Sequence, residues 1–163
     1  MRTILKLAIA TVVFGVLTAV SPAFAGQTYF VIKSGEGGKV EFPVTDDVVA
    51  KATAVEFKSK LPDQDEDMHT VKGPLLRDLL KAAGVSGKSV VAKAADGYEA
   101  EIPMSDLTSY DVIIAVTVDG KPITEDENGP SRILYPVEDN PKLQKNDDVG
   151  ARAVFQLKEL TVK

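Results

Sequence analysis

The stretch Gly73-Pro74-Leu75-Leu76-Arg77-Asp78-Leu79-Leu80-Lys81-Ala82-Ala83-Gly84-Val85 contains the clearest helix signal in the chain. Pro74 suits the first position of a helix, because the N–H group that proline lacks has no partner there anyway. Gly84 readily adopts the left-handed conformation that ends many helices. The apolar residues between them recur at helical spacing and so share one face, opposite the charged residues. The pattern predicts one amphipathic helix over about residues 74–83.

Short segments with strand patterns lie on both sides of this helix. Asp96-Gly97 and Asp119-Gly120 each follow an apolar run, as expected of tight hairpins. The expected strands are residues 29–32, 40–44, 55–61, 90–94, 98–102, 112–118, 121–123, 133–137 and 151–162, the last with a bulge. A short helix is expected over residues 45–50, a glycine-rich turn over 34–38, and acidic loops over 63–67 and 138–148. Because strands dominate without regular alternation with helices, we expect an α+β domain with mostly mixed or antiparallel sheets.

The N-terminal segment has the pattern of an export signal. Arg2 and Lys6 precede an apolar run, and Ala23-Phe24-Ala25 matches a small-x-small cleavage site. We therefore expect a signal peptide at residues 1–25, with an uncleaved anchor helix as the alternative. The apolar run is short for a membrane span, and no second arginine follows Arg2, which favours Sec-type export to a periplasm. The mature chain, residues 26–163, is expected to form a single domain without a membrane span.

The composition excludes several classes of function. The chain has no cysteine, which rules out disulfides, cysteine zinc sites, iron–sulfur centres and thiolate nucleophiles. Removing Arg2 and Lys6 from 19 basic residues leaves 17 against 24 acidic ones, a net charge of −7. We therefore expect no nucleic-acid partner. With one histidine and no Gly-x-Ser-x-Gly motif, hydrolysis by a serine or cysteine nucleophile has no candidate residues.

Seven short motifs follow one another along the chain from Gly73 to Leu157. They are Gly73–Val85, Asp96-Gly97-Tyr98, Ile102-Pro103-Met104-Ser105-Asp106, Ile114-Ala115, Asp119-Gly120-Lys121-Pro122, Gly129-Pro130-Ser131-Arg132-Ile133-Leu134-Tyr135-Pro136 and Gly150-Ala151-Arg152-Ala153-Val154-Phe155-Gln156-Leu157. In this order they resemble the oxidoreductase molybdopterin-binding domain of the sulfite-oxidase type. The resemblance covers the chain from about residue 70 to the end. It implies an α+β fold of several packed sheets, with molybdopterin as the family cofactor.

The chain also departs from the pattern of the family's enzymes. They hold molybdenum through a cysteine thiolate, which this sequence lacks. Their N-terminal cofactor-binding half is longer than residues 26–70 can supply. The Lys-Trp pair of their closing motif is Phe155-Gln156 here. They are usually exported with a twin-arginine signal, whereas this signal looks Sec-type. We therefore interpret the chain as a short exported relative that lacks the catalytic ligand, and we expect no bound cofactor.

Four residues are candidates for ligand binding. The resemblance places Arg132, in the family's P-x-R motif, near the pterin pocket; the alternative is an ion pair with a local carboxylate at a strand end. Arg152 could bind an anion through its forked guanidinium. Its alternative is an ion pair with Glu138 or Asp139. Tyr98 and Tyr135 are expected to lie on the rim of the same pocket.

His69 is a weaker candidate, for metal binding. Asp65, Asp67 and His69 stand at two-residue spacing, so they could share one face of a strand and suit a divalent ion. The alternative is an acidic loop that is simply solvated.

Two classes of function follow. The first is a non-catalytic periplasmic binding or sensory module for a small anionic ligand or a protein partner. The second is a molybdopterin-dependent oxidoreductase or an accessory subunit of one.

Overall fold

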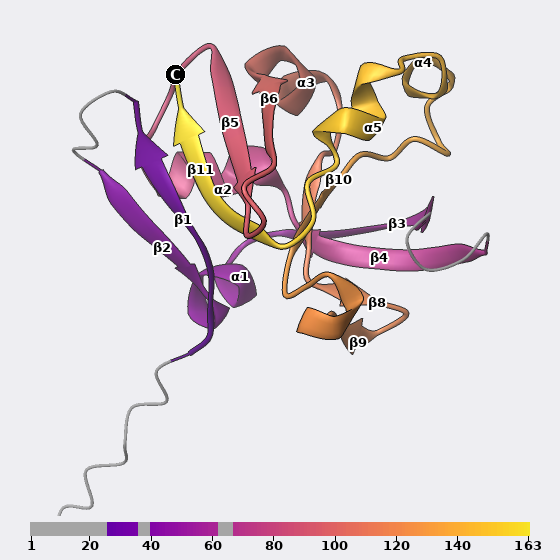
Figure 1. Cartoon of the computed structure of the whole chain (residues 1–163), viewed down its shortest axis with the longest axis horizontal. Coiled ribbons are helices and arrows are strands. Elements are labelled where there is room, and N and C mark those ends of the chain that lie inside the picture. The colour runs from indigo at the N-terminus through magenta and orange to yellow at the C-terminus, as the bar shows by residue number, and fades with distance from the viewer. Residues whose placement is uncertain (1–25, 36–39, 62–66) are drawn as a thin grey trace, which may run out of the picture.

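The computed structural model describes residues 26–35, 40–61 and 67–163. The predicted signal peptide lies outside the described residues, as do most of the predicted glycine-rich turn and of the first acidic loop. The figures show the fold with these parts as a grey trace (Figure 1).

The stretch around residues 73–85 forms a strand end followed by a helix. β4 (Met68–Pro74) runs up to Pro74, and α2 (Leu76–Ala82) begins two residues later than predicted, after the N-cap residue Leu75. Proline is tolerated at a strand end, where no ladder hydrogen bond needs its missing donor. The helix end is as predicted. Gly84 has φ 68°, its N–H bonds to the carbonyl of Lys81, and the next N–H bonds to Leu80, which is a Schellman cap.

The largest sheet has five strands in the order β2-β1-β11-β5-β6. Its strands are β1 (Thr28–Ser34), β2 (Glu41–Thr45), β5 (Ser89–Ala94), β6 (Glu99–Pro103) and β11 (Leu157–Val162). β1 runs parallel to β11, and the other pairs are antiparallel. The predicted hairpins 29–44 and 90–102 are therefore confirmed. α2 lies behind this sheet and buries Leu76, Leu79 and Leu80 in the same core as its strands (Figure 1).

A four-stranded sheet, β3-β4-β8-β9, projects from the other side of the domain (Figure 1). It contains β3 (Ala54–Lys60), β8 (Thr117–Val118) and β9 (Lys121–Pro122) beside β4, and all its pairs are antiparallel. β7 (Ile113–Ala115) pairs instead with β10 (Arg132–Leu134). The single strand predicted over residues 112–118 is therefore wrong, because the chain passes from one sheet to another at Val116. β4 was not predicted as a strand.

The C-terminal region is more helical than predicted. The expected loop over residues 138–148 contains α4 (Pro141–Gln144), and the first part of the expected strand 151–162 belongs to α5 (Asp148–Arg152). The shorter β11 carries the predicted irregularity, a register shift between Leu157 and Glu159. The remaining helices are short. They are α1 (Asp46–Lys51), α3 (Met104–Ser109) and the 3-10 turn η1 (Glu125–Glu127).

Two apolar clusters hold these layers together. The larger joins the five-stranded sheet to α2, α3 and the segment 133–154, and the smaller lies between β3, β4, β7 and β10. Burial of this apolar area is the main stabilising contribution in a chain without disulfides. Among the described residues, no helix has the length and apolar character needed to cross a membrane. The predicted fold class, an α+β domain of mostly antiparallel sheets with one main helix, is confirmed.

Candidate functional site

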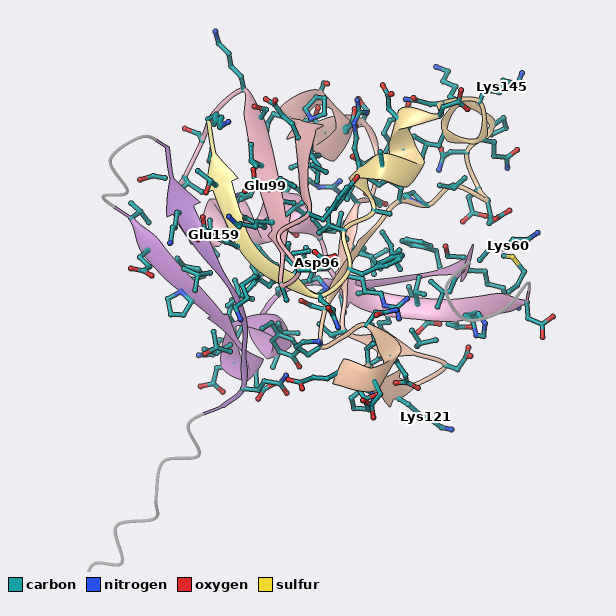
Figure 2. All side chains as sticks on the ribbon, in the orientation of Figure 1. Lys60, Asp96, Glu99, Lys121, Lys145 and Glu159 are labelled. Atoms are coloured by element: carbon teal, nitrogen blue, oxygen red, sulfur yellow. The ribbon has the colours of Figure 1, made fainter. Side chains whose placement is uncertain are left out.

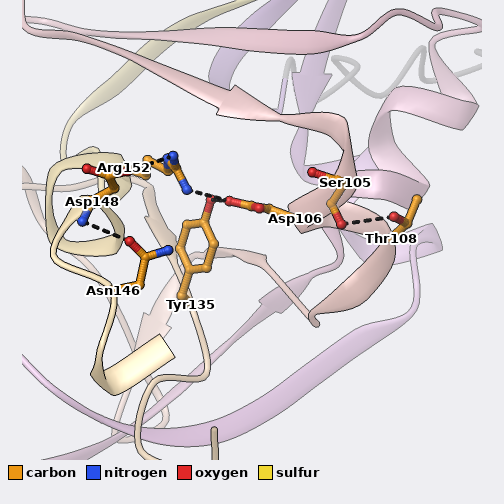
Figure 3. A network of polar contacts seen from close by, with 7 residues as sticks. All are labelled: Ser105, Asp106, Thr108, Tyr135, Asn146, Asp148 and Arg152. Atoms are coloured by element: carbon orange, nitrogen blue, oxygen red, sulfur yellow. Dashed lines mark hydrogen bonds and ion pairs between the residues drawn. The ribbon is translucent and has the colours of Figure 1, made fainter. Parts of the chain in front are cut away.

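A network of polar side chains joins three segments that are distant in sequence. Asp106 of α3 accepts a hydrogen bond from the Tyr135 hydroxyl at 3.0 Å, and one from Arg152 Nη1 of α5 at 2.9 Å (Figure 3). Arg152 Nη2 lies 3.3 Å from Asp148, one turn earlier in α5. The side chains of Arg152 and Asp106 are only 18% and 16% exposed. The network is therefore largely shielded from water, and hydrogen bonds there stabilise the fold more than they would at the surface.

Tyr135 acts in this network as a neutral hydrogen-bond donor. Its side chain is buried, and burial together with the neighbouring Asp106 carboxylate raises its pKa far above the usual range of a tyrosine. Its hydroxyl therefore keeps its proton and presents it to Asp106. This bond fixes the ring within the core.

The predicted partners of Arg152, Glu138 and Asp139, are wrong. Its partners are Asp106 and Asp148. Asp148 and Arg152 are four residues apart in α5, so they face each other on the helix. The predicted strand over residues 151–162 did not place them on one helix. Asp106 was part of a recognised motif, but its role depends on how α3 packs beside α5.

Loss of the central carboxylate is expected to destabilise the domain. Asp106→Ala leaves the Tyr135 hydroxyl and the Arg152 guanidinium without their shared acceptor, at an expected cost of about 2–3 kcal/mol. Asp148→Ala removes the other carboxylate on the same arginine. Since that carboxylate is 74% exposed, its loss is expected to cost at most about 1 kcal/mol. Urea denaturation of both variants would measure the difference, and equal effects would contradict the assigned role of Asp106.

Tyr98 approaches the same helix from the hairpin of β5 and β6. Its side chain is 46% exposed, and its hydroxyl donates a 2.7 Å hydrogen bond to the carbonyl of Ala151 in α5. Three of the four predicted ligand-binding residues, Tyr98, Tyr135 and Arg152, are thus gathered around α5. Their assignment to ligand binding stays a prediction.

Arg132 lies apart from this group and is completely buried. Its guanidinium donates a hydrogen bond to the backbone carbonyl of Glu127 and faces the ring of Phe155, with its central carbon 4.8 Å from the ring centre. Such cation–π stacking stabilises a desolvated guanidinium. The ring of Phe155 thus covers the arginine that the family motif singles out.

A cavity of about 370 Å³, which Phe155 also lines, lies between the end of β3, the segment after β10, and the α4–α5 region. The described residues that line it are Ser59, Lys60, Leu61, Leu134, Tyr135, Val137, Glu138, Leu143, Gln144, Asn146, Asp147, Val149, Gly150, Ala153 and Phe155. The volume falls within the range of small-molecule pockets. Of the four predicted residues, Tyr135 contributes directly to its wall. Sequence reasoning missed the rest because they come from three separate segments, two of which had been assigned to a loop and a strand.

His69 is paired with a carboxylate at the start of the β8–β9 hairpin. Its Nδ1 lies 2.8 Å from Asp119 Oδ2, while the backbone N–H of Thr70 donates to Asp119 Oδ1 at 2.8 Å. Asp65, one of the expected metal ligands, lies outside the described residues. Within residues 26–35, 40–61 and 67–163, no group of three or more potential metal ligands comes together. The arrangement at His69 joins two strands of the sheet.

Acidification is expected to weaken the contacts of Asp119 with His69 and Thr70 and so to lower the stability of the folded state. Hydrogen bonds from His69 and from the Thr70 N–H lower the pKa of Asp119 below its ordinary value of 3.8. A lowered pKa stabilises the folded state above the unfolded pKa, and the contribution is lost as the pH falls through the folded value. Asp119→Asn is therefore expected to lower the melting temperature at pH 5 and to have progressively less effect below pH 4. A constant difference between pH 5 and pH 2 would contradict the role of this carboxylate.

The sequence model of the oxidoreductase molybdopterin binding domain matches residues 52–138, more than half of the chain. This chain belongs to the oxidoreductase molybdopterin-binding domain family. The predicted resemblance is therefore confirmed. The matched segment runs from the end of α1 through the central motifs to the cavity wall at Glu138.

Comparison with solved structures supports the same fold. The crystal structure of the sulfane dehydrogenase SoxCD from Paracoccus pantotrophus matches with a TM-score of 0.58 and 19% sequence identity. The match covers 83% of this chain but 38% of that one, so this chain spans well under half of its length. At this identity the likeness concerns the fold alone. No curated protein matches the sequence.

The residues of this chain do not fit the molybdenum cofactor in the way the family's enzymes are expected to hold it. Soft thiolate ligation is impossible because the sequence contains no cysteine. Arg132, the motif arginine expected near the pterin, is fully buried and faces Phe155. Arg152, the second candidate for an anionic group, is already held by two carboxylates. The fold of the family is thus present with a different set of side chains.

Proposed function

We propose that this chain is an exported, cofactor-free binding module of the molybdopterin-binding domain family. The observation that carries the proposal is the position of Arg132, which is fully buried beneath the ring of Phe155 in a chain that has no cysteine. The groups expected to hold the cofactor are thereby missing or used within the fold. We place the binding site at the cavity beside Phe155, which is mostly apolar.

The sequence suggested an anionic ligand because Arg132 and Arg152 were expected to line the binding pocket. Neither Arg132 nor Arg152 lines the cavity. Arg152 bonds to Asp106 and Asp148, and Arg132 lies beneath Phe155. Most of the wall is apolar, so the site favours a ligand with an apolar body.

The proposal can be tested by producing the protein in two hosts, one with an intact molybdopterin pathway and one with that pathway blocked. A tightly bound cofactor would stabilise the folded state by mass action. We expect equal yields and melting temperatures from the two hosts. A protein that melts more than about 4 °C higher when made in the intact host would contradict the cofactor-free assignment.

The alternative is a molybdopterin-dependent oxidoreductase, or an accessory subunit of one. Membership of the family favours this function. It requires that molybdenum be held without a thiolate, and it predicts the higher melting temperature in the intact host.

Export makes a separate prediction. The mature protein isolated from the periplasm of its native host is expected to begin at Gly26, since the cleavage signal ends at Ala25. N-terminal sequencing of the periplasmic fraction would check this. Recovery of the uncleaved chain with the membranes would instead indicate an anchor helix.

A further inference from the structure

The cavity beside Phe155 has a polar rim whose chemistry is specific. Gln144 lines the cavity, and its Nε2 donates to the backbone carbonyl of Glu138 at 3.1 Å, so its side-chain oxygen is not used in that bond and can accept a hydrogen bond. The carboxylates of Glu138 and Asp147 line the same cavity, and no ion pair to a described residue holds either of them. The rim thus offers several acceptors.

The charges on this rim are unequal. Among the described lining residues, two are acidic, Glu138 and Asp147, and one is basic, Lys60 at the far end of β3 (Figure 2). Lys145, labelled beyond α4 in Figure 2, does not line the cavity. The mature chain adds a net charge of −7 from its 17 basic and 24 acidic residues. Both the local and the overall field therefore favour a positive ligand over a negative one.

The interior of the cavity is suited to an apolar body. Leu61, Leu134 and Leu143 line it together with the two aromatic residues Tyr135 and Phe155. Tyr135 is 2% exposed and its hydroxyl is engaged by Asp106, so the partly exposed Phe155 supplies the accessible aromatic surface. An aromatic wall of this kind packs well against flat apolar groups.

From these features we infer that the cavity binds a small organic cation, an amine with a flat apolar body and an ammonium head. The body lies against Phe155, and the head lies at Glu138, Asp147 and the Gln144 oxygen. An ammonium has three donors and no acceptor, which matches a rim of acceptors. The inference rests on the proposed function, because it needs a cavity that is free of molybdopterin.

Three naphthalene probes that differ in their head group test the inference. They are 2-(1-naphthyl)ethylamine, the neutral 2-(1-naphthyl)ethanol and the anionic 1-naphthylacetate. Each is titrated at pH 7 and low salt into the isotope-labelled mature protein, and amide shifts are followed by NMR. We expect shifts at Leu61, Tyr135 and Ala153, and an affinity for the amine at least about fivefold higher than for the carboxylate. Equal or tighter binding of the carboxylate, or no binding of any probe to the folded protein, would overturn the inference.

A variant and a matched control test whether Glu138 and Asp147 cause the preference for the amine. The double variant Glu138→Gln, Asp147→Asn is expected to bind the alcohol as before and to lose the preference for the amine. The control Asp47→Asn, Asp139→Asn changes the net charge equally at exposed residues that do not line the cavity, and should keep that preference. If the first variant keeps the preference, or the control loses it, the rim does not select the ligand. Molybdenum in the native protein would contradict the proposed function whatever the probes do, so the two failures are distinguishable.

Discussion

Gly73→Ala is expected to destabilise the domain by about 3 kcal/mol or more, a large part of the stability of a typical domain. A Cβ atom at this position would lie 1.8 Å from the carbonyl oxygen of Ile114 and 2.7 Å from its carbonyl carbon. Both atoms belong to the backbone of β7, so no side-chain rotation can relieve the clash, and β4 must move away from β7. Gly73 thus allows the close approach that joins the two sheets. Urea denaturation at 25 °C would measure the loss.

Gly150→Ala is the matched control for this prediction. An added Cβ meets nothing within 4 Å at Gly150, which lies inside α5. Alanine is a better helix former than glycine, so we expect no loss and a gain of up to about 1 kcal/mol. Equal effects of the two substitutions would contradict the idea that close packing at Gly73 is responsible.

Arg132→Ala is expected to cost about 3–5 kcal/mol. The substitution leaves a large cavity at a fully buried position, removes the stacking on Phe155, and takes the donor from the Glu127 carbonyl. Arg132→Met keeps most of the volume and is expected to lose about 1–3 kcal/mol, mainly through the missing hydrogen bond. Thermal and urea unfolding would measure both.

The exposed Lys58 of β3 provides the comparison for Arg132. Lys58→Ala should change the free energy of unfolding by no more than about 0.5 kcal/mol. If Arg132→Ala is as mild as this, the arginine is not a structural group, and a role in ligand binding regains its support.

Much of the fold could be predicted from local patterns. The helix end at Gly84 and the hairpins at Gly97 and Gly120 follow from residues that adopt positive φ angles, and all three have them in the structure. One error shows what local patterns miss. The apolar run 112–118 was assigned to one strand, but Ile113–Ala115 and Thr117–Val118 belong to different sheets. Where a continuous strand changes partner depends on tertiary packing, which hydrophobic periodicity does not reveal.

The site was harder to predict than the fold. The family motifs selected Arg132 and Arg152, but not whether their guanidinium groups face a pocket or the interior. The partner of Arg152 in α3, Asp106, is 46 residues away, so no local spacing connects them. The substitution at Phe155 was visible in the sequence. Its consequence, an aromatic ring over the arginine, required the geometry.

The chain has the fold of its family, and several of its motif residues contact other parts of the fold. The motifs retained by the chain serve packing at several positions: Gly73 permits close contact of two sheets, and Asp106, Tyr135 and Arg152 bond to one another. Family membership alone therefore does not establish catalysis, since one fold can serve several functions.

The most direct test of this account is to purify the mature protein from its native periplasm and to measure molybdenum by mass spectrometry and pterin by fluorescence on the same sample. The account predicts a folded protein that contains neither in stoichiometric amount. Molybdenum and pterin at about one per chain would contradict it and would show an enzyme that ligates the metal without cysteine.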